Sequence, residues 1–143
     1  MHADRAFIDT NVFIYIQRTD SANKTRISEK VIDFFDCFAS TQVLNETCNI
    51  LTRKYPSPKK EVERVLSSII ESCTVVTVTS DYPSRALEYH YKYSISYYDA
   101  LMVVAALDSN CKYLITEDMQ DGLIIEDKLQ IVNIYEHTDL LTR

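Results

Sequence analysis

The sequence predicts an α/β fold, a three-layer α/β/α sandwich in which helices cover both faces of a central, mainly parallel sheet of four to five strands. Short apolar or β-branched segments alternate along the chain with longer segments whose apolar residues recur at helical spacing, as is typical of parallel sheets. The content of 46% hydrophobic and 25% charged residues is that of a globular protein. At 143 residues the chain has the length of one ordinary domain, so we expect a single domain over residues 1–143.

Five short segments are expected to form the sheet. Each is rich in apolar or β-branched side chains, which favour extended backbone and pack well on a pleated surface. The expected strands span residues 6–8, 38–40, 74–78, 112–116 and 130–134. Binding sites in such sheets gather beyond the carboxyl ends of the strands, and Asp9 and Asp118 follow the first and fourth of these segments.

The intervals between the strands carry apolar residues three or four positions apart, which indicates helices packed on the sheet. Ser28 is a possible cap of the second helix, and Ser40 or Thr41 can cap the third. Pro56 and Pro58 end the third helix, because proline disfavours helical backbone in the residue before it. The expected helices span residues 12–17, 28–37, 42–54, 58–72, 80–93 and 96–108. The fourth of them is expected to direct five apolar residues inward: Val62, Val65, Leu66, Ile69 and Ile70.

The composition argues against several classes of active site. The single glycine excludes phosphate-binding loops of the Walker and dinucleotide types, which need several glycines at fixed offsets. The four cysteines have no paired spacing that suggests zinc or redox chemistry, and we interpret them as buried thiols: Cys37, Cys48, Cys73 and Cys111. The three histidines show no partner pattern for acid–base catalysis, which disfavours a histidine nuclease or a triad hydrolase: His2, His90 and His137.

Charge and hydropathy restrict the partners. A formal net charge of −6 argues against unaided binding to a phosphate backbone, so a nucleic-acid function needs a source of positive charge. The longest uninterrupted apolar run, residues 100–107, is too short to cross a bilayer, and the chain opens without the segments of a signal peptide. We therefore expect a soluble, cytoplasmic protein with no membrane partner.

Four acidic residues each have two interpretations, one as a residue of a functional site and one as an ordinary cap, turn or surface residue. Asp9 ends an apolar segment, where a site residue and a turn or helix-cap aspartate are equally good readings. Asp99 closes a Ser-x-x-Asp sequence that also fits a capping box at the start of an apolar helix. Glu46 fits a solvated helix face, and Asp118 fits a polar turn after a strand. Taken singly, none of them establishes a site.

The order and context of the four acids resemble the PIN domain family, specifically the VapC-type toxins of toxin-antitoxin pairs. Four stretches carry the resemblance, which spans nearly the whole chain: Asp-Thr-Asn-Val at 9–12, Ser-Thr-Gln-Val-Leu-Asn-Glu at 40–46, Ser-Tyr-Tyr-Asp-Ala-Leu at 96–101 and Tyr-Leu-Ile-Thr-Glu-Asp-Met-Gln-Asp-Gly at 113–122. The Asn-Pro-Phe ending usual in the family stands here as Asn133-Ile134-Tyr135, a departure at the end of the sheet and away from the site.

The resemblance implies a PIN-like nuclease domain and assigns its acidic cluster to four residues: Asp9, Glu46, Asp99 and Asp118. Its supporting polar groups fall on Thr10, Asn11 and Thr116. Glu117 and Asp121 compete with Asp118 for the fourth acidic position, and Asp121 is kept as the alternative. The resemblance also implies endoribonuclease activity on RNA, a homodimer, and inhibition by a cognate antitoxin protein.

Chemistry indicates what such a cluster holds. Carboxylates within a few ångströms raise one another's pKa unless a counter-charge is present. Oxygen ligands without thiolate or imidazole favour Mg²⁺ or Mn²⁺ over zinc, and such an ion activates water and stabilises charge in phosphodiester hydrolysis. We expect Asp9 and Asp99 as principal ligands, with Glu46 and Asp118 completing the cluster or holding a second ion. Weaker candidates for contacts to the RNA backbone are Arg53, Lys54, Lys59 and Lys60.

Four alternatives stay open. A PIN-type RNA-processing nuclease outside a toxin-antitoxin pair would carry the same acids. An aspartyl-phosphate phosphatase also places an aspartate after its first strand, but it needs a second one two residues later, where Asn11 stands. A receiver-like magnesium-binding module needs paired acids before its first site strand and a lysine after a late one, an order absent here. The intact acidic set disfavours a domain that only binds RNA or a partner.

Overall fold

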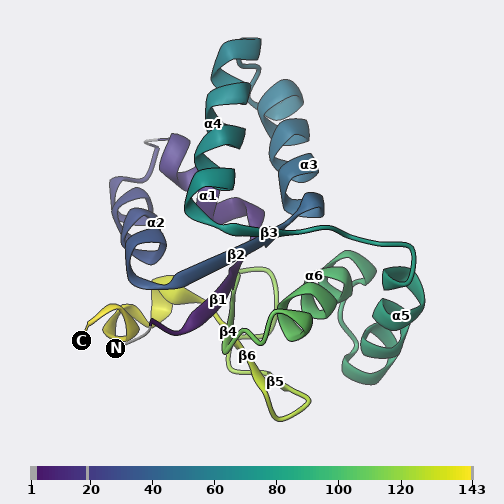
Figure 1. Ribbon diagram of the computed structural model, residues 1–143. Helices are drawn as coiled ribbons and strands as arrows, with labels where there is room; N and C mark the ends of the chain where they lie inside the picture. Colours follow the sequence, from purple (N-terminus) through teal and green to yellow (C-terminus); the bar gives the residue numbers. More distant parts are fainter. Residues whose placement is uncertain (1–2, 19, 143) are drawn as a thin grey trace.

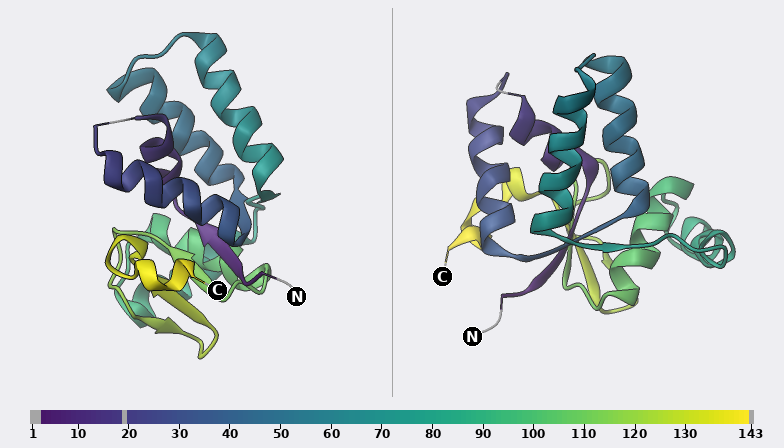
Figure 2. Two further views of the ribbon diagram at one scale, coloured as in Figure 1. Left: turned by 90° about the vertical axis from the view of Figure 1, so that its left-hand side faces the viewer. Right: turned by 45° about the horizontal axis from the view of Figure 1, so that its top comes forward.

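The computed structural model describes residues 3–18 and 20–142 and shows one six-stranded sheet with helices on both faces (Figure 1). The α-helices are α1 (Thr10–Gln17), α2 (Ala22–Phe34), α3 (Thr41–Asn49), α4 (Lys59–Ser72), α5 (Tyr82–Tyr93) and α6 (Tyr97–Asp108). Helices α1 to α4 lie on one face of the sheet, and α5 and α6 lie on the other (Figures 1 and 2). The expected α/β class with helices on both faces is confirmed. Among the histidines, His2 lies outside the described residues.

The strands are β1 (Arg5–Ile8), β2 (Asp36–Ser40), β3 (Thr74–Val76), β4 (Tyr113–Ile115), β5 (Ile124–Ile125) and β6 (Leu129–Val132). Their order is β3-β2-β1-β4-β6-β5, and every neighbouring pair is parallel except β5 and β6. Phe7 of the central strand β1 pairs with Phe38 on one side and with Leu114 on the other. The sheet has one strand more than the five expected from the sequence. The additional strand is β5, whose two residues are too few for a sequence pattern to predict.

The buried core extends over both faces of the sheet, and its central part lies where β1 and α6 meet. Ala6, Phe7 and Ile8 are fully buried, and so are nearly all of residues 100–106 in α6. Helix α6 is apolar all round because it contacts β1, β2 and β4 on one side and α5 on the other. Full burial of one large apolar side chain contributes about 1.5–3 kcal/mol, so this contact adds substantially to the stability of the fold. Within residues 3–18 and 20–142, no helix is both long enough and apolar enough to span a membrane.

Helix α2 begins and ends earlier than expected. Ser21, and not Ser28, is its cap, because the Ser21 hydroxyl accepts a hydrogen bond of 3.4 Å from the Lys24 amide. Ser28 is buried inside the helix, 2.7 Å from the Tyr135 hydroxyl. The helix ends at Phe34, since Phe35 is extended and leads into β2. The expectation of helix as far as Cys37 is therefore wrong.

The third and fourth helices follow the expected pattern with two changes. Ser40 caps α3, and the helix continues as a π-helix, η1 (Ile50–Lys54), to the end expected from Pro56. Helix α4 buries a narrow stripe formed by Val62, Val65 and Ile69. Ile70, expected to face inward, is 56% exposed because it lies beside this stripe.

The parallel order of β2, β1 and β4 brings their carboxyl ends to one edge of the sheet. The residues that follow these ends are Thr41 after β2, Asp9 after β1, and Thr116 after β4. The candidate site lies at this edge. Two short 3₁₀ turns, η2 (Ile134–Glu136) and η3 (Thr138–Leu141), follow β6.

Candidate active site

The four expected acids line one pocket of about 310 Å³. They come from four separate segments: the end of β1, helix α3, the first turn of α6, and the loop after β4. The lining consists of Asp9, Thr10, Asn11, Glu46, Asn49, Ile50, Asp99, Met102 and Asp118. The sheet edge therefore brings together carboxylates that lie far apart in the sequence.

Asp9 is the most buried of the four acids, with 5% of its surface exposed. Its carboxylate accepts hydrogen bonds from the Thr10 amide at 2.6 Å and from the Thr116 hydroxyl at 2.7 Å. Burial raises the pKa of Asp9 from 3.8 to about 6, against these two hydrogen bonds, and the negative charges of Asp118 and Glu46 raise it further. Asp9 thus caps α1 and also lines the pocket, so its two sequence interpretations are compatible.

Glu46 and Asp99 face the same pocket from the two helical layers. The Thr10 hydroxyl donates a 2.8 Å hydrogen bond to Oε1 of Glu46. The Asp99 amide donates to the Ser96 hydroxyl at 3.1 Å, so the expected cap forms while the carboxylate lines the pocket. Burial raises the pKa of Asp99, a hydrogen bond from Ser96 opposes this, and the charges of Asp118 and Glu46 add to it.

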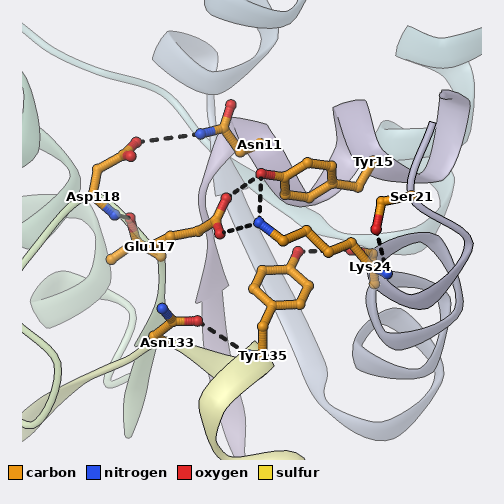
Figure 3. A network of polar contacts seen from close by, with 10 residues as sticks. Asn11, Tyr15, Ser21, Lys24, Glu117, Asp118, Asn133 and Tyr135 are labelled. Carbon is orange, nitrogen blue, oxygen red and sulfur yellow. Dashed lines mark hydrogen bonds and ion pairs between the residues drawn. The ribbon is translucent and has the colours of Figure 1, made fainter. Parts of the chain in front are cut away.

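Asp118 and Glu117 are consecutive but turn in different directions. Figure 3 shows Asp118 directed toward Asn11, whose amide nitrogen lies 3.3 Å from Oδ2. Glu117 instead accepts hydrogen bonds from the Tyr15 hydroxyl and, at 2.8 Å, from Lys24 (Figure 3). Glu117 is therefore neutralised by a lysine outside the pocket, and Asp118 lines the pocket.

Asp121, expected as a supporting residue and as the alternative to Asp118, lies outside the pocket. Its carboxylate accepts a 2.8 Å hydrogen bond from the Asn133 amide and lies 2.6 Å from Nε2 of His137. Both contacts lower the pKa of Asp121, the Asn133 amide more than His137. The turn at Gly122, where φ is +87°, leads the chain back toward β5 and β6 and carries Asp121 away. Asp121 therefore fixes the end of the sheet.

The supporting residues act in different ways. Thr10 and Asn11 line the pocket, whereas Thr116 holds Asp9 and also accepts a 3.1 Å hydrogen bond from the Asp118 amide. Three further lining residues were not expected from the sequence: Asn49, Ile50 and Met102. Asn49 and Met102 each follow a site acid by three positions on its helix, and this spacing is the signal that predicts them.

None of the four basic residues expected to contact RNA lines the pocket. Arg53 and Lys54 are exposed in the last turn of η1, with the Lys54 ammonium 5.4 Å from the centre of the Tyr55 ring. Lys59 and Lys60 are exposed at the start of α4, where Lys59 lies 3.3 Å from Glu63. Their contact with RNA stays a prediction.

The donor set of the pocket fits a hard divalent cation. The four charged side chains in the lining are all carboxylates, which are oxygen donors of the kind that Mg²⁺ and Mn²⁺ prefer. Burial raises the pKa of Asp9 and Asp99, and the charges of the neighbouring carboxylates add to the shift, so a cation in the pocket would favour their ionised forms. In the described part of the chain, no three or more His, Cys, Asp or Glu side chains are already close enough to hold a metal ion.

The sequence matches the profile of the PIN domain family over residues 6–120. A comparison with curated proteins gives no significant match. The fold is similar to a toxin-antitoxin complex from Klebsiella pneumoniae, with a TM-score of 0.66 and 17% identity, covering 90% of this chain and 96% of that one.

Two further solved structures share the fold. The Mycobacterium tuberculosis toxin VapC20, described as cleaving the sarcin-ricin loop, gives a TM-score of 0.63 at 17% identity and covers 76% of this chain and 86% of that one. The Rickettsia felis complex VapBC2, bound to promoter DNA, gives 0.57 at 18% identity and covers 78% and 86%. The family match includes the four segments that supply the pocket carboxylates. The chain therefore belongs to the PIN domain family.

Proposed function

We propose that this protein is a Mg²⁺- or Mn²⁺-dependent endoribonuclease that acts as the toxin of a type II toxin-antitoxin pair. The observation that carries the proposal is the convergence of Asp9, Glu46, Asp99 and Asp118 in one pocket. Burial raises the pKa of Asp9, and the charges of Asp118 and Glu46 raise it further, so a cation in the pocket would stabilise the ionised carboxylates. Membership of the PIN family and the similarity to toxin structures support the same reading.

Each acid has a distinct part in the proposed reaction. Asp9, fixed by Thr10 and Thr116, and Asp99, on the first turn of α6, are the principal ligands of the cation. Glu46 and Asp118 complete the cluster and orient the attacking water or a second ion. When bound, the cation makes water a stronger acid and stabilises the charge of the phosphoryl group and of the leaving oxygen.

The proposed partners follow from the family and from charge. VapC20 is described as a toxin that cleaves the sarcin-ricin loop, and the Klebsiella and Rickettsia structures are toxin-antitoxin complexes. We assign to this chain an RNA substrate, a cognate antitoxin that blocks the pocket, a homodimeric state and a cytoplasmic location. Arg53 and Lys54, exposed in the last turn of η1, are the positive charges that we assign to contacts with the RNA backbone in a chain of net charge −6.

The test is RNA cleavage by the purified protein with Mg²⁺, with Mn²⁺ and with a chelator. We expect metal-dependent cleavage by the wild type, loss of at least about 100-fold in Asp9→Asn, and retained cleavage in Asp121→Asn. Asp121→Asn is the matched control, because that carboxylate lies outside the pocket. Metal-dependent cleavage retained by Asp9→Asn would contradict the proposal.

Two outcomes would point to the alternatives. Transfer of a phosphoryl group to Asp9, trapped as an acyl phosphate, would favour an aspartyl-phosphate phosphatase or a receiver-like module. Cleavage of RNA without any small partner gene beside the coding sequence would favour an RNA-processing nuclease outside a toxin-antitoxin pair.

A further inference from the structure

The side chain of Gln42 connects α3 and α6, the helices on opposite faces of the sheet that carry Glu46 and Asp99. Gln42 lies in the first turn of α3, and its Nε2 is 3.4 Å from Oε2 of Glu46, one turn further along the same helix. The same nitrogen donates to the backbone carbonyl of Tyr98 at 3.1 Å. Tyr98 immediately precedes Asp99 in the first turn of α6. One amide group therefore contacts both Glu46 and the residue before Asp99.

Both contacts require a donor, which fixes the orientation of the amide. A carboxylate and a carbonyl only accept hydrogen bonds, so the nitrogen of Gln42 must face them. Its oxygen is left buried without a partner, and Oε1 of Gln42 is the only buried side-chain oxygen or nitrogen atom in this state among residues 3–18 and 20–142. An unsatisfied buried acceptor costs stability, so a side chain suited only to packing would be apolar here.

Gln42 also completes the hydrogen bonding that holds Glu46. The Thr10 hydroxyl donates to Oε1 of Glu46 at 2.8 Å, and Gln42 approaches Oε2. Each carboxylate oxygen thus has one donor from the protein and keeps lone-pair capacity toward the pocket. The donors come from α1 and α3, so the position of Glu46 is set by two helices.

We propose that Gln42 is a positioning residue for the acidic pocket, holding Glu46 at a fixed place relative to the α6 turn that carries Asp99. The proposal rests on the proposed function, in which the pocket binds a divalent cation. Gln42 does not line the pocket and acts through Glu46 and the Tyr98 carbonyl. Outer partners of this kind orient the groups that contact a metal and increase its affinity.

The test replaces Gln42 by methionine, which has a similar length and no donor. Calorimetric titration with Mn²⁺ should show about 10-fold weaker binding in Gln42→Met, as is typical for loss of an outer hydrogen-bonding partner. The melting temperature should be equal to or above that of the wild type, because the unsatisfied oxygen is removed. If Gln42 had only a structural role, Gln42→Met would instead bind Mn²⁺ with wild-type affinity and would melt at a lower temperature than the wild type. Gln130→Met, at an exposed glutamine of β6, is the matched control and should bind Mn²⁺ like the wild type.

A double-mutant cycle identifies the route of the effect. In a Glu46→Gln background the substitution Gln42→Met should change Mn²⁺ affinity by less than about 2-fold, since the coupled group is already altered. Wild-type affinity in folded Gln42→Met, or an undiminished loss in the Glu46→Gln background, would overturn the proposal. Gln42→Leu provides the same comparison if the methionine variant does not fold. Failure of the wild type to bind Mn²⁺ would instead contradict the proposed function.

Discussion

The Thr116 hydroxyl donates a 2.7 Å hydrogen bond to Oδ2 of Asp9, joining residues 107 positions apart in the sequence. The bond links the ends of two neighbouring parallel strands, β1 and β4, at the floor of the acidic pocket. It opposes the effect of burial on Asp9, yet the pKa of Asp9 still reaches about 6. The site is therefore built at a cost to the metal-free fold, which leads to the first prediction.

Asp9→Asn should stabilise the metal-free protein at pH 7. The pKa of Asp9 is about 6 in the folded chain and near 3.8 otherwise, so the folded state binds more protons between these values and loses stability as the pH rises through them. Asparagine carries no charge, so the variant does not lose this stability. Its free energy of unfolding at pH 7 should exceed that of the wild type by up to about 3 kcal/mol, because one pKa unit corresponds to about 1.4 kcal/mol. Urea unfolding in a chelator at pH 7 and at pH 4 measures the difference, which should vanish at pH 4. A less stable variant at pH 7 would contradict this account.

The contact between His137 and Asp121 should titrate. The hydrogen bond to Asp121 raises the pKa of His137 above 6.5, so this contact stabilises the fold fully below pH 6.5 and is lost as the pH rises through the higher folded value. The pKa of His137, measured by NMR, should fall in Asp121→Asn. His137→Gln should destabilise the protein at pH 6 and have little effect at pH 9. An unchanged His137 pKa in Asp121→Asn would show that the pair does not form.

Lys24 should contribute more to the free energy of unfolding than a lysine in an exposed ion pair does. Lys24 neutralises Glu117, whose side chain is only 19% exposed, and its ammonium lies 4.9 Å from the centre of the Tyr15 ring. Lys24→Met should lower the free energy of unfolding by about 1 kcal/mol, the upper end of the range for pairs of this kind. The matched control is Lys92→Met, whose pair with Glu126 is more exposed and should contribute less. Equal effects of the two substitutions would argue against a special role for Lys24.

Much of the site follows from the order of elements in the sequence. Asp9 ends an apolar strand and Asp118 follows another, and parallel strands place such ends at one edge of the sheet. The local patterns of Asp99 and Glu46 also fit a capping box and a solvated helix face, and the family resemblance assigns both residues to the acidic cluster. The backbone turns that begin α1 and α6 also direct Asp9 and Asp99 into the pocket, so for these two residues the capping pattern and the site are compatible.

Other features depend on tertiary contacts that no local pattern contains. Glu117 and Asp118 are neighbours in sequence, and Glu117 is distinguished by hydrogen bonds from Tyr15 and Lys24, which lie 102 and 93 positions away. Asp121 lies away from the pocket because the Asn133 amide, which follows β6, holds it. The true cap of α2, Ser21, and the two-residue strand β5 lack enough neighbouring signal to be identified before the chain is folded.

The central claim, a divalent-cation site formed by the four carboxylates, is tested most directly by calorimetric titration of Mn²⁺ into the wild type, Asp9→Asn and Asp99→Asn. We predict saturable binding by the wild type and binding weakened at least about 10-fold in each folded variant. Equal Mn²⁺ affinity in all three proteins would contradict the claim.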